Sequence, residues 1–123
     1  MSDYKHLQVW QESMDLVESI YKLIKFFPKE EVYALSSQLR RAVVSIPSNI
    51  AEGQNRNTQK EFIQFLYISL GSASEVETQL LIAKRLNYIN NIDNELKQIT
   101  KIRKMINGLI SSIKRKDNNA INY

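Results

Sequence analysis

Apolar residues recur at steps of three and four along most of the chain, the spacing that places them on one face of an α-helix. The pattern is clearest after residue 58, where Thr58 and Glu61 have the spacing of a capping box. In that motif the Thr58 hydroxyl takes the backbone amide of Glu61, and the carboxylate returns to Thr58. Small residues around Gly71 predict that a neighbouring helix approaches closely there. The predicted core face of this helix is Phe62, Leu66, Ser69, Ala73, Val76, Leu80 and Ala83.

The segment from Leu7 to Phe27 has two apolar stripes instead of one. Pro28 ends it, because the residue before a proline disfavours the helical conformation. A helix that is apolar over more than one stripe usually buries the extra surface against a partner, so the pattern favours oligomerisation. The alternative is a generous core with a few exposed aromatics. The first stripe is Trp10, Met14, Val17, Tyr21 and Ile24, and the second is Leu16, Ile20, Leu23 and Phe27.

Another helix is predicted from Val32 to Glu52. Pro47 lies inside it and deletes the bond from its own nitrogen to the carbonyl of Val43, which predicts a kink. Gly53 is placed to be the left-handed C-terminal cap. The predicted buried face is Leu35, Leu39, Ala42, Val43, Ile46 and Ile50.

The last helix starts at Asn91 or Asp93, either of which can cap it, and ends at the run Asp117-Asn118-Asn119. Connections of roughly 4 to 8 residues favour antiparallel neighbours. The sequence therefore predicts an all-α fold, an antiparallel up-down-up-down four-helix bundle with helix 2 kinked at Pro47. One domain would span residues 1–117, followed by a frayed tail of residues 118–123. The core face of the last helix is Leu96, Ile99, Ile102, Ile106, Leu109 and Ile113.

The amino-acid composition excludes most kinds of catalytic and metal site. The 123 residues include no cysteine and one histidine, His6, so the chain can build neither a thiolate zinc site nor the Glu-x-x-His pairs of a di-iron bundle. It has no phosphate-binding loop and no nucleophile motif, so we predict no enzyme activity, no metal and no cofactor. The polar N-terminus is no signal peptide, and no apolar run approaches the ~20 residues of a membrane span. We expect a soluble, cytoplasmic protein with no membrane partner.

Positive charge gathers in the last third of the chain. The net charge is +4, but residues 84–123 sum to +6 and the residues before them to −2. Lys97, Lys101 and Lys104 lie along one face of the last helix. Such a stripe would neutralise phosphates without reading sequence and would be sensitive to salt, whereas a merely solvated face is the alternative. The predicted nucleic-acid-binding residues are Lys84, Arg85, Lys97, Lys101, Arg103, Lys104, Lys114, Arg115 and Lys116.

A polar stripe runs beside the apolar one around Pro47. Its members recur at helical steps, and it permits two interpretations. It is either a ligand or RNA site, or a structural network in which Glu52, Arg41 and Asn49 satisfy groups freed by Pro47. The spacing is not chemically specific, which favours the structural network. The residues of the predicted network are Arg40, Arg41, Asn49 and Glu52.

The stretch from Ser37 to Gly53, SQLRRAVVSIPSNIAEG, resembles the signature of the four-helix-bundle proteins linked to intervening sequences in 23S ribosomal RNA. Residues 7–10 (LQVW), 26–30 (FFPKE), 60–66 (KEFIQFL) and 71–81 match the same pattern. The resemblance covers about residues 4–115 and leaves the tail from Asn118 to Tyr123 outside.

The resemblance implies a small antiparallel bundle that assembles into a ring, a homopentamer. The family is also similar to the accessory proteins of diversity-generating retroelements, pentameric barrels that bind nucleic acid and a reverse transcriptase through basic surfaces. The resemblance implies no catalytic residues for this chain. The matching positions Arg40, Arg41, Asn49 and Glu52 are family hallmarks whose purpose the resemblance leaves open.

Two functions fit these observations. The first is a non-catalytic, ring-forming bundle that binds nucleic acid, RNA before DNA, electrostatically through its basic surface. The second is a structural adaptor that recruits a protein partner, such as a reverse transcriptase, and has no direct role with nucleic acid. In both, the chain's first partner is itself.

Overall fold

The structure is a computed structural model that describes residues 3–121, and the side chains of residues 3–117. Four long helices, α1 (Gln8–Ile24), α2 (Leu35–Gln54), α3 (Gln59–Arg85) and α4 (Asp93–Ile121), make up most of it. Two short 3-10 helices, η1 (Tyr4–His6) and η2 (Lys29–Glu31), precede α1 and α2. The described residues contain no strand. The predicted all-α fold with four helices is confirmed.

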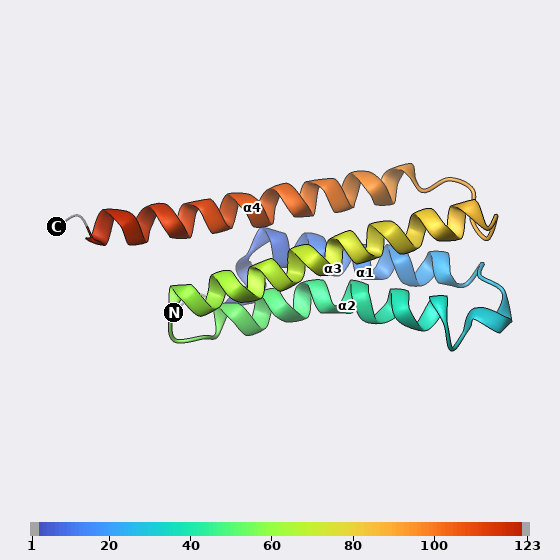
Figure 1. Cartoon of the computed structure of the whole chain (residues 1–123), viewed down its shortest axis with the longest axis horizontal. Helices are drawn as coiled ribbons and strands as arrows, with labels where there is room; N and C mark the ends of the chain where they lie inside the picture. The colour runs from blue at the N-terminus through green and yellow to red at the C-terminus, as the bar shows by residue number, and fades with distance from the viewer. Residues whose placement is uncertain (1–2, 122–123) are drawn as a thin grey trace.

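The four helices close into a bundle. α2 packs most extensively on α3, α1 packs on α2 and α4, and α3 also packs on α4, while neither diagonal pair is in close backbone contact within the described residues. Figure 1 shows the consecutive helices running in alternating directions along the long axis of the molecule. The helices therefore stand at the corners of a closed four-sided arrangement, and each presents one face to the core and one outward.

The core follows the predicted period closely in α3, where all seven residues of the predicted face are buried. In α4 the fully covered residues are isoleucines, while Leu96 and Leu109 lie at the edge of the core. In α1 the structure decides between the two stripes. Leu16 and Ile20 are completely buried, whereas Met14 and Tyr21 of the other stripe are each 42% exposed. The apolar surface of α1 that the bundle leaves exposed is therefore limited to Met14 and Tyr21. The other residues of the same stripe lie in or against the core: Trp10, Val17 and Ile24.

The start of α3 has the predicted cap in part. Thr58 Oγ1 accepts the backbone amide of Glu61 at 3.2 Å. The carboxylate of Glu61 was expected to return to the backbone of Thr58, but it accepts the Thr58 hydroxyl instead, at 3.1 Å. Both arrangements hold the first turn, since the side-chain oxygen satisfies an amide that has no partner inside the helix.

Gly53 is not the left-handed cap that the sequence predicted. α2 continues through it to Gln54, and no described glycine has a positive φ. Gly53 is buried where α2 meets α3, and a Cβ at this position would lie 2.7 Å from Phe65 Cβ and 2.9 Å from Phe62 Cδ1. The absence of a side chain is thus needed for helix approach, which a local capping rule cannot reveal.

Close approach was predicted at the wrong glycine. Gly71 is exposed, and a Cβ added there would meet nothing within 4 Å, whereas Ser69, Ser72 and Ala73 are buried. The small residues of α3 therefore do face its neighbours, but Gly71 is on the outer side of the helix.

The ends of the other helices differ from the predicted ones by a few residues. α2 starts at Leu35 instead of Val32, where Glu31 Oε1 accepts the Leu35 amide at 3.4 Å. Pro47 is buried inside α2, which is helical on both sides of it, and the kink there stays a prediction.

α4 begins at Asp93, whose amide is bound by Asn91 Oδ1 at 3.0 Å. It does not end at Asp117-Asn118-Asn119 but continues to Ile121. The frayed tail stays a prediction, and residues 122–123 lie outside the described residues.

Candidate functional site

The outward face of α4 carries a row of cations. Lys97, Lys101, Lys104 and Arg115 are exposed, and they lie on the side of the helix opposite the buried isoleucines, as the helical period requires. At 1.5 Å per residue the row from Lys97 to Arg115 is about 27 Å long. No acidic residue lies between these two positions in the sequence, although the uncharged Gly108 and Ser111 separate Lys104 from Arg115 on this face.

The far end of α4 extends past the rest of the bundle. Figure 1 shows its C-terminal turns projecting beyond the start of α3 and the end of α2. Lys114, Arg115 and Lys116 lie near this end, and all three are exposed. A projecting basic helix end is open to a bulky partner from several sides.

Three of the nine predicted binding residues already have partners within the chain. Lys101 Nζ lies 2.8 Å from Glu12 Oε1 on α1, and Arg103 Nη2 lies 3.4 Å from Glu77 Oε1 on α3. Lys114 Nζ donates to Tyr67 Oη at 3.1 Å and lies over that ring. These contacts tie α4 to its two neighbours, so they reduce the charge available to an outside ligand.

The remaining six cations have no ion-pair partner in the described part of the chain. They fall into two groups. Lys84 and Arg85 end α3 at the end of the bundle where α4 begins, opposite the projecting end of α4 (Figure 1). The structure thus brings the row on α4 together, but it does not join all nine residues into one patch. The six unpaired cations are Lys84, Arg85, Lys97, Lys104, Arg115 and Lys116.

The turn after α3 fixes where Lys84 and Arg85 lie. Asn87 adopts a positive φ of 62°, a conformation that asparagine tolerates better than most residues. The Asn87 amide bonds the Lys84 carbonyl and the Tyr88 amide bonds the Ala83 carbonyl, each at 3.0 Å, which is the Schellman pattern of a helix end.

Tyr88 then ties this turn to η2, because its hydroxyl donates to Glu31 Oε2 at 2.8 Å. That hydrogen bond, followed by burial and the negative charges of Glu31 and Glu30, raises the pKa of the Tyr88 phenol above its ordinary value.

The four residues of the predicted polar network do not bond to one another. Arg40 Nη2 donates to the Val32 carbonyl at 3.2 Å, and Glu52 Oε1 pairs with Arg56 Nη2 at 2.6 Å. Arg41 is exposed on the outer side of α2. Asn49 is half-buried and bonds to Ser45 of its own helix.

The polar contacts beside Pro47 come from α3 instead. Ser69 Oγ donates to the Ile46 carbonyl at 3.0 Å, and Ser72 Oγ lies 2.8 Å from Ser45 Oγ. Asn49 Nδ2 donates to Ser45 Oγ and to the Ser45 carbonyl, each at 2.8 Å. Serines of α3 thus supply the polar contacts to α2 beside Pro47, and the small residues in the middle of α3 were the signal for them. We call the contact between these two helices the α2–α3 seam.

Several large apolar side chains remain exposed outside the core. On α1 they belong to the stripe of Met14 and Tyr21, and Phe26 and Tyr33 in the α1–α2 connection are 73% and 93% exposed. On α3 the exposed apolar residues are Tyr67, Ile68, Leu81 and Ile82. Together they form apolar surface on more than one side of the bundle.

His6 is exposed in η1, and no group of three His, Asp or Glu side chains in the described part of the chain could hold a metal ion. Among the helices that the structure describes, none combines the length and the hydropathy that a transmembrane span requires.

These features define a class, a small helical bundle with a basic outer helix. Residues 5–108 match the model of the 23S rRNA-intervening sequence protein family, and the chain belongs to this family. The match includes Lys97, Lys101 and Lys104 but stops short of Lys114, Arg115 and Lys116. The resemblance found in the sequence is therefore confirmed, over a slightly shorter stretch than expected.

A solved structure has the same fold. The crystal structure of a protein with unknown function from the S23 ribosomal protein family of Bacteroides thetaiotaomicron is 28% identical to this chain, with a TM-score of 0.76. The similarity covers 83% of this chain and 97% of that one. No curated protein matches the chain. Neither the family nor this neighbour carries a described catalytic activity.

Proposed function

We propose that this protein is a non-catalytic nucleic-acid-binding bundle that holds RNA by its phosphates along the outer face of α4. The observation that carries the proposal is the row from Lys97 to Arg115. Its members are exposed, lie on one side of the helix, and lead to an end that projects from the bundle. Three members of the row have no counter-ion among the described residues: Lys97, Lys104 and Arg115.

The chemistry of the row favours phosphates over bases. Lysine ammonium groups are point charges that neutralise phosphates without reading sequence. Tyr67, an aromatic ring beside α4, is already covered by Lys114. Stacking of single-stranded bases therefore contributes little, and binding depends on salt and hardly on sequence.

We further propose that copies of the chain associate into a ring, a homopentamer, through apolar surface that the single bundle leaves exposed. Met14 and Tyr21 are the first candidates, because they are the two residues of their stripe that the bundle leaves exposed. A ring repeats the basic row once in every copy. Several weak rows on one RNA then act together, which raises the overall affinity without new contacts.

The direct test of RNA binding is a salt titration. With a fluorescent single-stranded RNA of about 30 nucleotides, the affinity should fall steadily between roughly 50 and 200 mM salt, with a slope of about −0.7 per phosphate contact on logarithmic axes. Nucleic acid that copurifies with the protein should be RNA and should be released by salt. Absence of binding at low salt, or an affinity unaffected by salt, would contradict the proposal and leave the adaptor role, in which the row meets an acidic protein surface.

The ring is tested separately by light scattering at micromolar concentration. The wild-type mass should be a multiple of the single chain, and five copies are expected. The double variant Met14→Glu/Tyr21→Glu should reduce it to one chain while the protein stays helical. A monomeric wild type contradicts the ring, and a variant that keeps the wild-type mass excludes this stripe as the contact.

A further inference from the structure

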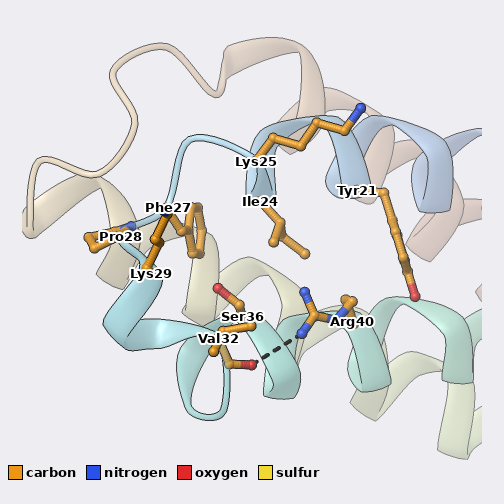
Figure 2. Close-up of a pocket in the computed structure, with 9 residues that line it drawn as sticks. All are labelled: Tyr21, Ile24, Lys25, Phe27, Pro28, Lys29, Val32, Ser36 and Arg40. Carbon is orange, nitrogen blue, oxygen red and sulfur yellow. Dashed lines mark hydrogen bonds between the residues drawn. The ribbon is translucent and has the colours of Figure 1, made fainter.

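A groove lies at the end of the bundle away from the projecting end of α4. It is an open groove lined by the last turn of α1, by η2 and by the first turns of α2, and its volume is about 560 Å³ (Figure 2). Cavities of this size are typical of small-molecule sites. The apolar part of its lining includes Ile24, Phe27 and Val32. None of the nine cations proposed to meet RNA lines it, so it is a separate feature.

Ser36 is the first sign that the groove is made for a ligand. The residue is 3% exposed, and its hydroxyl makes no hydrogen bond with any described residue. Figure 2 shows the hydroxyl rising from α2 toward the space between Ile24 and Phe27. Most of the residue is covered, but its hydroxyl oxygen keeps access to the groove, so it can take a hydrogen-bond partner from there. A ligand oxygen in the groove would supply it.

Arg40 is the second sign. Its Nη2 donates to the Val32 carbonyl at 3.2 Å, which holds the guanidinium beside the groove. Figure 2 shows the other terminal nitrogen of Arg40 directed toward the interior, on the side of Ile24. The guanidinium has five N–H donors, and it has no carboxylate partner in the described part of the chain. It is therefore free to bind an anion at the floor of the groove.

The surrounding charge favours an anion as well. Lys25 and Lys29 belong to the lining and no acidic residue does, although the ammonium of Lys25 points away from the groove in Figure 2. The nearby carboxylate of Glu31 is engaged, since it accepts from Tyr88 Oη at 2.8 Å and from the Leu35 amide at 3.4 Å. The N-terminus of α2 begins at Leu35, next to Ser36, and its partial positive charge has the same sign as the cations.

We propose that this groove binds a small carboxylate with an apolar body. The carboxylate accepts hydrogen bonds from Arg40 and Ser36, and the apolar body covers Ile24, Phe27 and Val32. Charge-assisted bonds between guanidinium and carboxylate are strong and directional, and the apolar walls exclude a bare phosphate backbone as the preferred occupant. Ser36 directly precedes the stretch from Ser37 to Gly53 that resembles the family signature, and Arg40 lies within it.

The test uses three probes with the same hydrocarbon tail: octanoate, 1-octanol and octylammonium. Each is titrated calorimetrically into the full-length protein below its micelle concentration. Octanoate should bind once per chain and about tenfold or more tightly than 1-octanol, while octylammonium should show no binding. Equal affinity of octanoate and 1-octanol, or no heat from octanoate, would overturn the proposal.

Variants then locate the site. Arg40→Gln should weaken octanoate binding by about tenfold or more, and Ser36→Ala by roughly threefold to tenfold. Lys22→Gln is the matched control, because Lys22 is an exposed cation of α1 outside the lining and its removal should leave the affinity unchanged. Circular dichroism checks each fold, and Ser36→Ala alone carries the test if Arg40→Gln does not fold. Unchanged affinity in a folded Arg40→Gln or Ser36→Ala protein, or an equal loss in Lys22→Gln, places the binding elsewhere.

Discussion

The α2–α3 seam and α4 are attached to the bundle in opposite ways. At the seam the helices approach closely, because Gly53 leaves room for Phe62 and Phe65, and buried serines bond across the contact. α4 meets its neighbours through a line of isoleucines, and ion pairs at the edges hold it to α1 and α3.

This difference indicates which positions of the fold can tolerate a change of residue. Close packing of side chains determines the stability of the seam, so a single added methyl group there should destabilise the protein. Amphipathic periodicity alone determines α4, so its outward face is free to carry charge without a cost to the core. The same division explains why the row of cations from Lys97 to Arg115 lies on the outward face of α4 and not at the seam.

The largest difference between the seam and α4 is expected when a glycine in each is replaced by alanine. Gly53→Ala should destabilise the protein by about 1–3 kcal/mol, because the new Cβ must displace Phe65 Cβ from 2.7 Å. Gly108→Ala on α4 should stabilise it by about 0.5–1 kcal/mol, since nothing lies within 4 Å of that site and alanine favours the helix. Urea unfolding of both variants measures the free energies. Gly71→Ala, equally open on the outside of α3, is the control and should behave like Gly108→Ala.

A smaller effect is expected from a hydroxyl in the seam. Ser69→Ala removes the bond from Ser69 Oγ to the Ile46 carbonyl and should cost about 1 kcal/mol. Thr78→Ala removes a similar bond to the Ser74 carbonyl, but on an exposed face where water replaces it, so the stability should hardly change. The same urea measurement decides. Equal losses in the two variants would show that the seam is no more demanding than the surface.

The smallest effect is expected from the ion pair between Lys101 and Glu12. It is mostly exposed, with 60% of the lysine side chain and 28% of the glutamate side chain accessible. A double-mutant cycle with Lys101→Gln and Glu12→Gln should give a coupling of about 0.2–1 kcal/mol that shrinks as salt rises. A coupling well above this range would mean that electrostatics, and not the isoleucine line, holds α4 in place.

Sequence periodicity was enough to find the four helices and the buried side of α3. It also placed Lys97, Lys101 and Lys104 on one face, because residues three or four apart on a helix share a side. It showed that α1 has two apolar stripes, yet it could not tell which one faces the core. That choice depends on where α2 and α4 lie, which no local pattern contains.

The wrong or absent predictions have the same cause, which is that they depend on residues of other helices. Gly53 fits a helix cap by its position in the sequence, but its real constraint is Phe65 of α3. The carboxylates of Glu12 and Glu77 that neutralise Lys101 and Arg103 lie on other helices, so a charge count along α4 overstates the free charge. The groove was not predicted at all, because Ser36 and Arg40 gain their meaning from Ile24 and Phe27 of a different segment.

The most direct test of RNA binding by α4 is a comparison of two triple variants with the same change in net charge. Lys97→Glu/Lys104→Glu/Arg115→Glu alters the row, and Lys5→Glu/Lys22→Glu/Lys60→Glu alters exposed lysines elsewhere. Fluorescence anisotropy with labelled RNA should show that the row variant loses most of the affinity and that its slope against salt is shallower by about 2 to 3 on logarithmic axes. The control should retain nearly the wild-type slope. Equal losses in the two variants would contradict the assignment of binding to the outward face of α4.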